Sequence, residues 1–170
     1  MTLLYFNVGG EPIPQGSKRL VGGIKTHARL IDDNPRLKAY RKAVTAKAKA
    51  AMSGSDALAY LPPNDHQPTD FPLRGPVDVV VTFYFSHLKA HYKTVTRKGK
   101  SYLTHLRDDA PAVKATRPDV DKLCRSILDA LTDAGVYADD GQVVMLFARK
   151  LYWDNQEPKG TTEIIVRTHE

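Results

Sequence analysis

Acidic side chains gather around one predicted helix of an otherwise basic chain. The stretch 117–141 contains Asp119 and Asp121 near its start, and Asp139 and Asp140 near its end. Carboxylate oxygens are the ligands that Mg²⁺ and Mn²⁺ prefer. Carboxylates that converged on one point would repel one another unless a cation lay between them. These residues could therefore hold a divalent metal ion if the fold brought the two ends of the stretch together.

Ordinary structural roles are open for the same acids. Asp121 could cap the helix, and Asp139 and Asp140 before Gly141 are typical of a turn. Asp129 and Asp133 could be exposed helix positions. Spacing alone leaves both the metal site and these roles open.

A helix must position the first pair of acids. Apolar residues recur with helical spacing up to residue 134, which predicts an amphipathic helix with one face in the core. The members of this apolar stripe are Val120, Leu123, Cys124, Ile127, Leu128, Leu131 and Ala134. Gly135 would end the helix. Pro118 favours an extended entry, in which Asp119 and Asp121 would project together, and Arg125 follows Asp121 by one turn.

A strand must position the second pair. The segment 136–153 turns at Asp139–Gly141 and continues as an apolar strand interspersed with Gln142, Arg149 and Lys150. If this strand packs back along the helix, Asp139 or Asp140 could approach the helix N-terminus only where the sheet carries them there.

The positive charge is concentrated in two segments. The chain has a net charge of +6, yet 34–52 holds six Lys or Arg without an acid, and 86–117 holds eight against Asp108 and Asp109. A polyanion is the natural partner of such segments, because neutralised phosphates release condensed counterions. The alternative is a solvated helix face and a disordered loop. Lys18 and Arg19, in a predicted loop at 10–19, could also contact phosphate.

The remaining pattern predicts one domain over 1–170. The elements that we expect are a strand at 2–8, a helix from Asn34 as N-cap and Pro35 to Met52, a surface connection at 53–76, a strand at 77–85 and a loose basic hairpin around Lys98–Gly99 within a flexible 86–116.

The chain has 170 residues, no apolar run near the length of a membrane span, and no secretory signal, so we expect a cytoplasmic location. Cys124, the single cysteine, would pack in the core.

The segment "RPDVDKLCRSILDALTDAGVYADDGQVV" resembles the signature of the RusA family of Holliday-junction resolvases, which includes versions carried by phages and prophages. In that family an Asp-x-Asp pair opens a helix, Asp-Ala-Leu follows within it, and Asp-Asp-x-Gln comes after it. The corresponding residues here are Asp119 and Asp121, Asp129–Leu131, and Asp139–Gln142.

The resemblance implies an α+β fold with a mixed β-sheet and two main helices, in a homodimer. It implies a Mg²⁺-dependent endonuclease, for which Mn²⁺ is an alternative metal, that makes paired nicks in four-way DNA junctions during recombination and repair in a bacterial cell. The metal ligands would be Asp119, Asp121 and Asp140, with Asp139 as a neighbour without an assigned role.

Two positions depart from the family pattern. The family usually has Asn directly after the second Asp of the pair and Lys four residues after that Asp, whereas this chain has Lys122 and Arg125. Lys122 could contact phosphate or relax the choice of substrate. Arg125 keeps the charge but exchanges protons poorly, so we assign it to phosphate binding and to transition-state charge.

The basic side chains would contact the backbone of the DNA arms. They are Arg117, Lys122, Lys18, Arg19, Lys93, Arg97, Lys98, Lys100 and Lys150. Two other functions stay open: a non-catalytic protein of the same fold that binds junctions or other DNA, and a Mg²⁺-dependent nucleotide phosphohydrolase. A histidine metal site from His87, His91 and His105 competes with simple solvation of these side chains.

Overall fold

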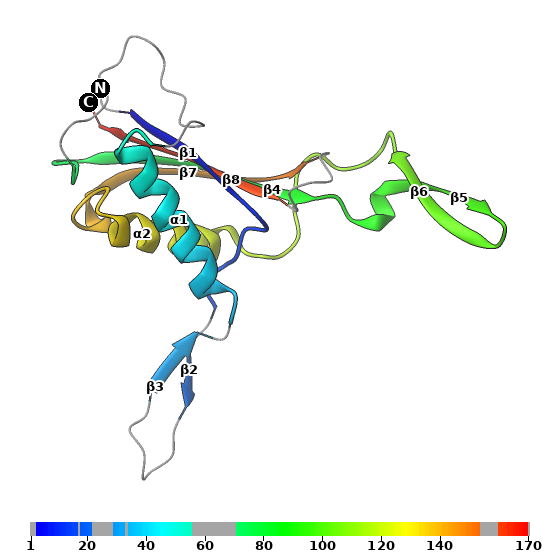
Figure 1. Cartoon of the computed structure of the whole chain (residues 1–170), viewed down its shortest axis with the longest axis horizontal. Helices are drawn as coiled ribbons and strands as arrows, with labels where there is room; N and C mark the ends of the chain where they lie inside the picture. The colour runs from blue at the N-terminus through cyan, green and yellow to red at the C-terminus, as the bar shows by residue number, and fades with distance from the viewer. Residues whose placement is uncertain are drawn as a thin grey trace.

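The computed structural model describes residues 3–16, 18–21, 29–32, 34–55, 71–153 and 160–169. Along the chain the elements are β1 (Leu3–Gly9), β2 (Lys18–Val21), β3 (Arg29–Asp32), α1 (Leu37–Met52), β4 (Val77–Ser86), η1 (Lys89–His91), β5 (Tyr92–Arg97), β6 (Lys100–Leu106), α2 (Val120–Ala134), η2 (Asp140–Gln142), β7 (Val143–Trp153) and β8 (Thr161–Thr168) (Figure 1).

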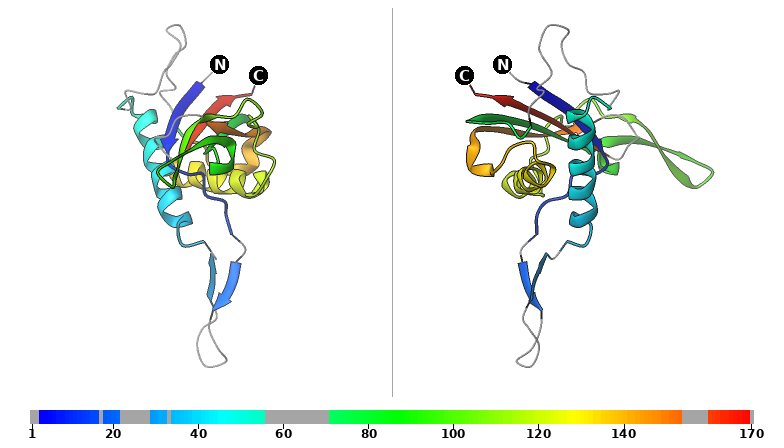
Figure 2. Two further views of the ribbon diagram at one scale, coloured as in Figure 1. Left: turned by 90° about the vertical axis from the view of Figure 1, so that its right-hand side faces the viewer. Right: turned by 60° about the vertical axis from the view of Figure 1, so that its left-hand side comes forward.

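Four strands form one mixed sheet in the order β1-β8-β4-β7. β8 is antiparallel to both β1 and β4, whereas β7 runs parallel to β4 at the edge of the sheet. Both helices lie on the same side of this sheet (Figures 1 and 2). The prediction of an α+β fold with a mixed sheet and two main helices is therefore confirmed.

The core lies between the sheet and the helices. Alternate residues of β4 point toward the helices, and the five predicted from the pattern are buried: Val77, Val79, Val81, Phe83 and Phe85. β8 adds Ile164 and Val166 from the middle of the sheet. This strand was not anticipated from the sequence, although its β-branched residues favour a strand.

α1 buries the face that its spacing predicted, from Leu37 through Tyr40 and Val44. It begins two residues later than expected. The Asn34 side chain accepts a hydrogen bond from the Arg36 amide, and the Leu37 amide donates to the Asn34 carbonyl. Asn34 therefore forms a turn that precedes the helix rather than its N-cap.

α2 begins and ends close to the predicted positions. Gly135 ends it in the left-handed conformation, as the sequence indicated. Val120 differs from the expected core stripe, because 39% of its surface is exposed. It is the first residue of the helix.

Two hairpins project away from the sheet and helices in different directions (Figure 1). β5 and β6 form the basic hairpin that the sequence predicted, turning at Lys98 and Gly99, both with positive φ. β2 and β3 form the other, so the loop predicted over 10–19 is wrong from Lys18 onward.

The connection predicted at 53–76 is described only in part. Its residues 56–70 lie outside the described chain, and Leu73 is buried rather than on the surface. Neither α1 nor α2, in the chain that the structure describes, has the length and apolar character needed to cross a bilayer as a helix.

Candidate functional site

Asp119 and Asp121 lie at the start of α2 in different backbone positions. Asp119 is the N-cap, in an extended conformation, and its carboxylate lies 3.2 Å from the Lys122 ammonium. Asp121 lies within the first helical turn and is exposed. The extended entry therefore reaches only as far as Asp119, and the N-cap is Asp119 rather than Asp121. That both carboxylates project together stays a prediction.

Asp119 lines a cleft of about 470 Å³ between the N-termini of both helices. The loop 10–16 forms one wall and is held by the Gln15 amide, which donates to the Lys122 carbonyl at 2.9 Å. The lining residues are Glu11, Pro12, Pro14, Gln15, Gly16, Asn34, Arg36, Arg117, Pro118, Asp119 and Lys122. The cations in this cleft outnumber the carboxylates, so it can attract a phosphate next to Asp119.

An ion pair orders the outer part of this cleft. The Arg36 guanidinium donates to the Glu11 carboxylate at 2.9 Å, and both side chains are more than half exposed. Exposed pairs of this kind contribute little to stability and can exchange for a stronger anion. Neither Glu11 nor Arg36 was identified from the sequence, because 25 residues separate them and no spacing rule connects them.

Lys150 holds the segment that leads into α2. Its ammonium donates to the Thr116 carbonyl at 2.8 Å and to the Pro118 carbonyl at 2.7 Å. These contacts give Lys150 a positioning role at the site. The DNA contact that the sequence suggested for it stays a prediction.

The side chains of Asp139 and Asp140 have different roles in their turn. The Asp139 carboxylate accepts a hydrogen bond from the Gly141 amide at 2.8 Å, which caps η2. A side chain at Gly141 would place its Cβ 2.7 Å from the same carboxylate oxygen. Asp140 is exposed within η2. Of the two acids, Asp140 is the better placed for chemistry.

Gln142 fixes this turn from both ends of its side chain. Its carbonyl oxygen accepts from the Ala138 and Asp139 amides, and its amide nitrogen donates to the carbonyls of Leu73 and Gly75. This explains physically why Gln follows the Asp pair.

The acids at the two ends of α2 do not meet within one chain. α2 has 15 residues, about 22 Å of helix. η2 follows its C-terminus, and the Tyr137 hydroxyl donates to the Leu128 carbonyl in the second half of the helix. Among the described residues, no group of three or more His, Cys, Asp and Glu is placed to hold a metal ion. The chemistry of the predicted donor set suits Mg²⁺, but a single chain does not assemble it.

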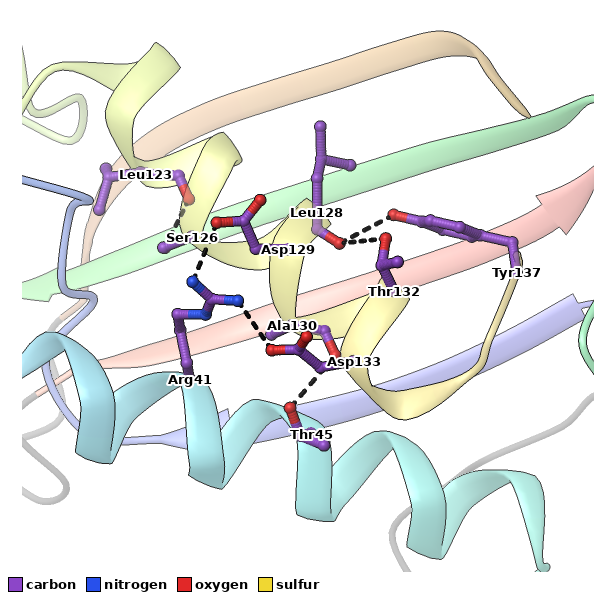
Figure 3. A network of polar contacts seen from close by, with 10 residues as sticks. All are labelled: Arg41, Thr45, Leu123, Ser126, Leu128, Asp129, Ala130, Thr132, Asp133 and Tyr137. Carbon is purple, nitrogen blue, oxygen red and sulfur yellow. Dashed lines mark hydrogen bonds and ion pairs between the residues drawn. The ribbon is translucent and has the colours of Figure 1, made fainter. Parts of the chain in front are cut away.

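Asp129 and Asp133 connect the two helices instead. The Arg41 guanidinium lies 3.0 Å from the Asp129 carboxylate and 2.7 Å from that of Asp133, and the Thr45 hydroxyl donates to the Ala130 carbonyl (Figure 3). One cation of the basic helix is thus paired with acids of α2. These acids have a packing role.

The hairpin β5–β6 carries exposed basic residues at its tip. Arg97, Lys98 and Lys100 surround the turn and are exposed. Lys93 pairs with Asp108 at 3.1 Å nearer the base. The side chains of Lys18 and Arg19, on β2, lie outside the described part of the chain.

His87 and His91 meet at the base of this hairpin. Their Nδ1 atoms are 3.1 Å apart, and the His87 ring stacks on Tyr152 with ring centroids 4.9 Å apart. Among the described residues, His87, His91 and His105 form no three-ligand group that could hold a metal ion. The rings of His87, His91 and Tyr152 pack against one another.

Cys124 is buried on the apolar side of α2. Burial raises the pKa of its thiol to about 11, and the charge of Asp121 adds to this shift. The thiol is therefore protonated and shielded at neutral pH, as its position on the core stripe indicated.

The family model described as Endodeoxyribonuclease RusA matches residues 9–167 of the chain. The matched region contains both helices, the cleft and the turn of Asp139 and Asp140. A comparison with curated proteins returns no match.

Proposed function

Because the chain belongs to the RusA family of endodeoxyribonucleases, whose activity is the hydrolysis of DNA phosphodiester bonds at Holliday junctions, we propose that it resolves these junctions by paired, metal-dependent nicks. The observation that carries this proposal is the cleft at the start of α2. There Asp119 lies beside Arg36, Arg117 and Lys122, so a carboxylate and phosphate-binding cations share one surface.

The proposed metal ligands are Asp119, Asp121 and Asp140, and the proposed metal is Mg²⁺ or Mn²⁺. When bound, such an ion lowers the pKa of a coordinated water and neutralises charge on the phosphate. The exposure of Asp121 and Asp140 supports this assignment, because both carboxylates are open to solvent. Asp139, whose carboxylate caps η2, is left with a structural role.

The cations near the start of α2 would bind the scissile phosphate. Arg117 and Lys122 line the cleft, and Arg125 is exposed one turn beyond Asp121. A guanidinium can donate two parallel hydrogen bonds to phosphate oxygens. We assign Arg125 to the stabilisation of transition-state charge, with Lys122 and Arg117 orienting the DNA backbone.

The proposed homodimer has a use in this reaction. A four-way junction with approximate two-fold symmetry presents two equivalent scissile bonds, and two equivalent sites can cut them. Arg97, Lys98 and Lys100 at the tip of hairpin β5–β6 are exposed at a distance from the cleft and would contact a DNA arm through its phosphates.

The test compares cleavage of a synthetic four-way junction by wild-type protein in Mg²⁺ and in EDTA, and by the Asp121→Asn variant in Mg²⁺. Asp129→Asn is the matched control, because Asp129 lies in the same helix but pairs with Arg41. We expect paired nicks from wild type and Asp129→Asn in Mg²⁺, and binding without nicks in the other two reactions. Nicks by Asp121→Asn would contradict the ligand assignment. Binding without cleavage in every reaction would favour a junction-binding protein.

A further inference from the structure

The hairpin β5–β6 carries a groove of about 500 Å³ that its own residues line. Both strands and the turn contribute to it, and the lining residues are Val95, Arg97, Lys98, Tyr102 and Thr104. The cleft at the start of α2 is lined by other residues. Because the hairpin projects away from the sheet and the helices (Figure 1), a partner can reach this groove from outside.

The strand register places most of the groove on one face of the hairpin. Val95 pairs with Tyr102, and Arg97 pairs with Lys100. Directly opposed residues of antiparallel strands point to the same face, and so do residues two apart along one strand. Thr104 follows Tyr102 by two residues and joins them. This face of five residues, the Tyr102 face, therefore combines an aromatic ring, an aliphatic side chain and two cations.

The opposite face of the hairpin has a different chemistry. Thr94 pairs with Leu103, and Thr96 pairs with Ser101. The hydroxyls of Thr96 and Ser101 lie 3.5 Å apart. These four side chains carry no charge. An anionic partner of this part of the hairpin is therefore attracted to the Tyr102 face.

Tyr102 presents its ring to solvent. The residue is 52% exposed, and Val95, its neighbour across the two strands, is 42% exposed. The two side chains form an apolar surface beside the cations of the turn. A flat partner that covered the ring would remove this apolar area from water and would stack on the ring face.

The cations of the groove are available for an external anion. Arg97, Lys98 and Lys100 are exposed, whereas the ion pairs described in this hairpin and its base engage Lys93 and Arg107. An acidic protein surface would neutralise the cations without a flat group for the ring, and an apolar surface would leave the cations unpaired. Nucleic acid supplies both a flat base and flanking phosphates, which is the combination that single-strand binding sites recognise.

The base of the hairpin is attached to the edge strand β7. The His87 ring, before the hairpin, stacks on Tyr152 with ring centroids 4.9 Å apart. After the hairpin, the Lys114 amide donates to the Lys150 carbonyl at 3.1 Å. The Lys150 ammonium in turn donates to the Pro118 carbonyl at the start of α2. The groove and the cleft are thus connected through the same strand.

We propose that the Tyr102 face of hairpin β5–β6 binds a DNA base that is not stacked within a duplex. The Tyr102 ring stacks on the base, Val95 contacts its edge, and Arg97 and Lys98 bind the neighbouring phosphates. The inference rests on the proposed function, because the arms of branched DNA expose base faces where they meet. Single-stranded DNA offers the same chemistry and serves as a simple probe.

The test measures DNA binding in EDTA, without cleavage, by fluorescence anisotropy. The DNAs are a four-way junction, a single-stranded oligothymidylate and, as a competitor, a relaxed closed circular duplex. Tyr102→Ala should weaken binding of the junction and of the single strand by between about fivefold and about 150-fold, the range expected for loss of one base–aromatic stack. Its affinity for the circular duplex should stay within about twofold of wild type, because that DNA exposes no unstacked base.

Two further variants separate the ring from the hydroxyl and from the other face. Tyr102→Phe keeps the ring and should bind all three DNAs as wild type does. Leu103→Ala, the matched control, removes an exposed apolar side chain from the opposite face and should also bind normally. Tyr102→Ala should leave the slope of log K against log salt unchanged, because tyrosine neutralises no phosphate. Unchanged circular dichroism checks that each variant is folded.

The outcomes that contradict the proposal differ from those that contradict the proposed function. Unchanged affinity of Tyr102→Ala for the junction and the single strand would overturn the inference. An equal loss on all three DNAs would place Tyr102 on a duplex arm and would overturn it too, as would a Tyr102→Phe protein as weak as Tyr102→Ala. Wild-type protein that binds as expected but makes no nicks in Mg²⁺ would overturn the proposed function alone.

Discussion

The Lys150 ammonium donates a hydrogen bond to the Pro118 carbonyl at 2.7 Å, so the edge strand β7 holds the residue that directly precedes Asp119. A second bond to the Thr116 carbonyl fixes the same segment. Lys150, which the sequence suggested as a DNA contact, thus positions the start of α2.

Lys150→Met should therefore reduce cleavage more than binding. The methionine keeps most of the apolar stem but leaves the Thr116 and Pro118 carbonyls without this donor, at a cost of about 1–3 kcal/mol in the free energy of unfolding. We expect the rate of nicking at saturating protein to fall at least about tenfold, because small displacements of catalytic groups are costly. Lys150→Arg should recover part of the rate. A loss confined to junction affinity would instead favour a direct DNA contact.

Gln142 should be required for the turn that presents Asp140. Gln142→Leu removes four hydrogen bonds to the backbone, including those to the Leu73 and Gly75 carbonyls. The expected loss is about 2–4 kcal/mol in the free energy of unfolding, measured by urea denaturation. Gln142→Glu keeps the acceptor for the Ala138 and Asp139 amides but sets a carboxylate oxygen against the Leu73 and Gly75 carbonyls, so it should also be destabilised. Equal stabilities of all three proteins would show that the side chain does not hold the turn.

Cys124 should react only when the protein unfolds. Burial raises the pKa of its thiol from 9.0 to about 11, so at pH 8 very little thiolate forms in the folded state. Alkylation by iodoacetamide at pH 8 should be at least about tenfold slower in native protein than in urea. The raised pKa also makes the free energy of unfolding depend on pH. As pH rises from about 9 toward 11, the thiol of the unfolded chain ionises first, so the free energy of unfolding falls. Rapid alkylation of native protein would mean that the first half of α2 opens readily.

The sequence predicted the elements with strong periodicity and missed those that depend on pairing. The stripe of α2 apart from Val120 and the alternation of β4 were predicted correctly, because one amphipathic period determines each of them. The end of α2 at Gly135 was also predicted correctly, because glycine adopts the left-handed conformation easily. β8 was missed, since its place between β1 and β4 depends on partners remote in the chain. For the same reason the sequence could not show that Arg36 and Glu11 border the cleft.

The tip of hairpin β5–β6 should control affinity without controlling chemistry. Replacement of Arg97, Lys98 and Lys100 by Ala removes three exposed cations that no ion pair among the described residues engages. If each cation neutralises one phosphate, the slope of log K for junction binding against log salt should decrease by up to about 2.7, because each phosphate contact contributes about 0.9. The nicking rate at saturating protein should stay within about twofold of wild type, since the hairpin projects away from the cleft at the start of α2 (Figure 1). An unchanged salt slope in the triple variant would mean that the hairpin does not contact the DNA backbone.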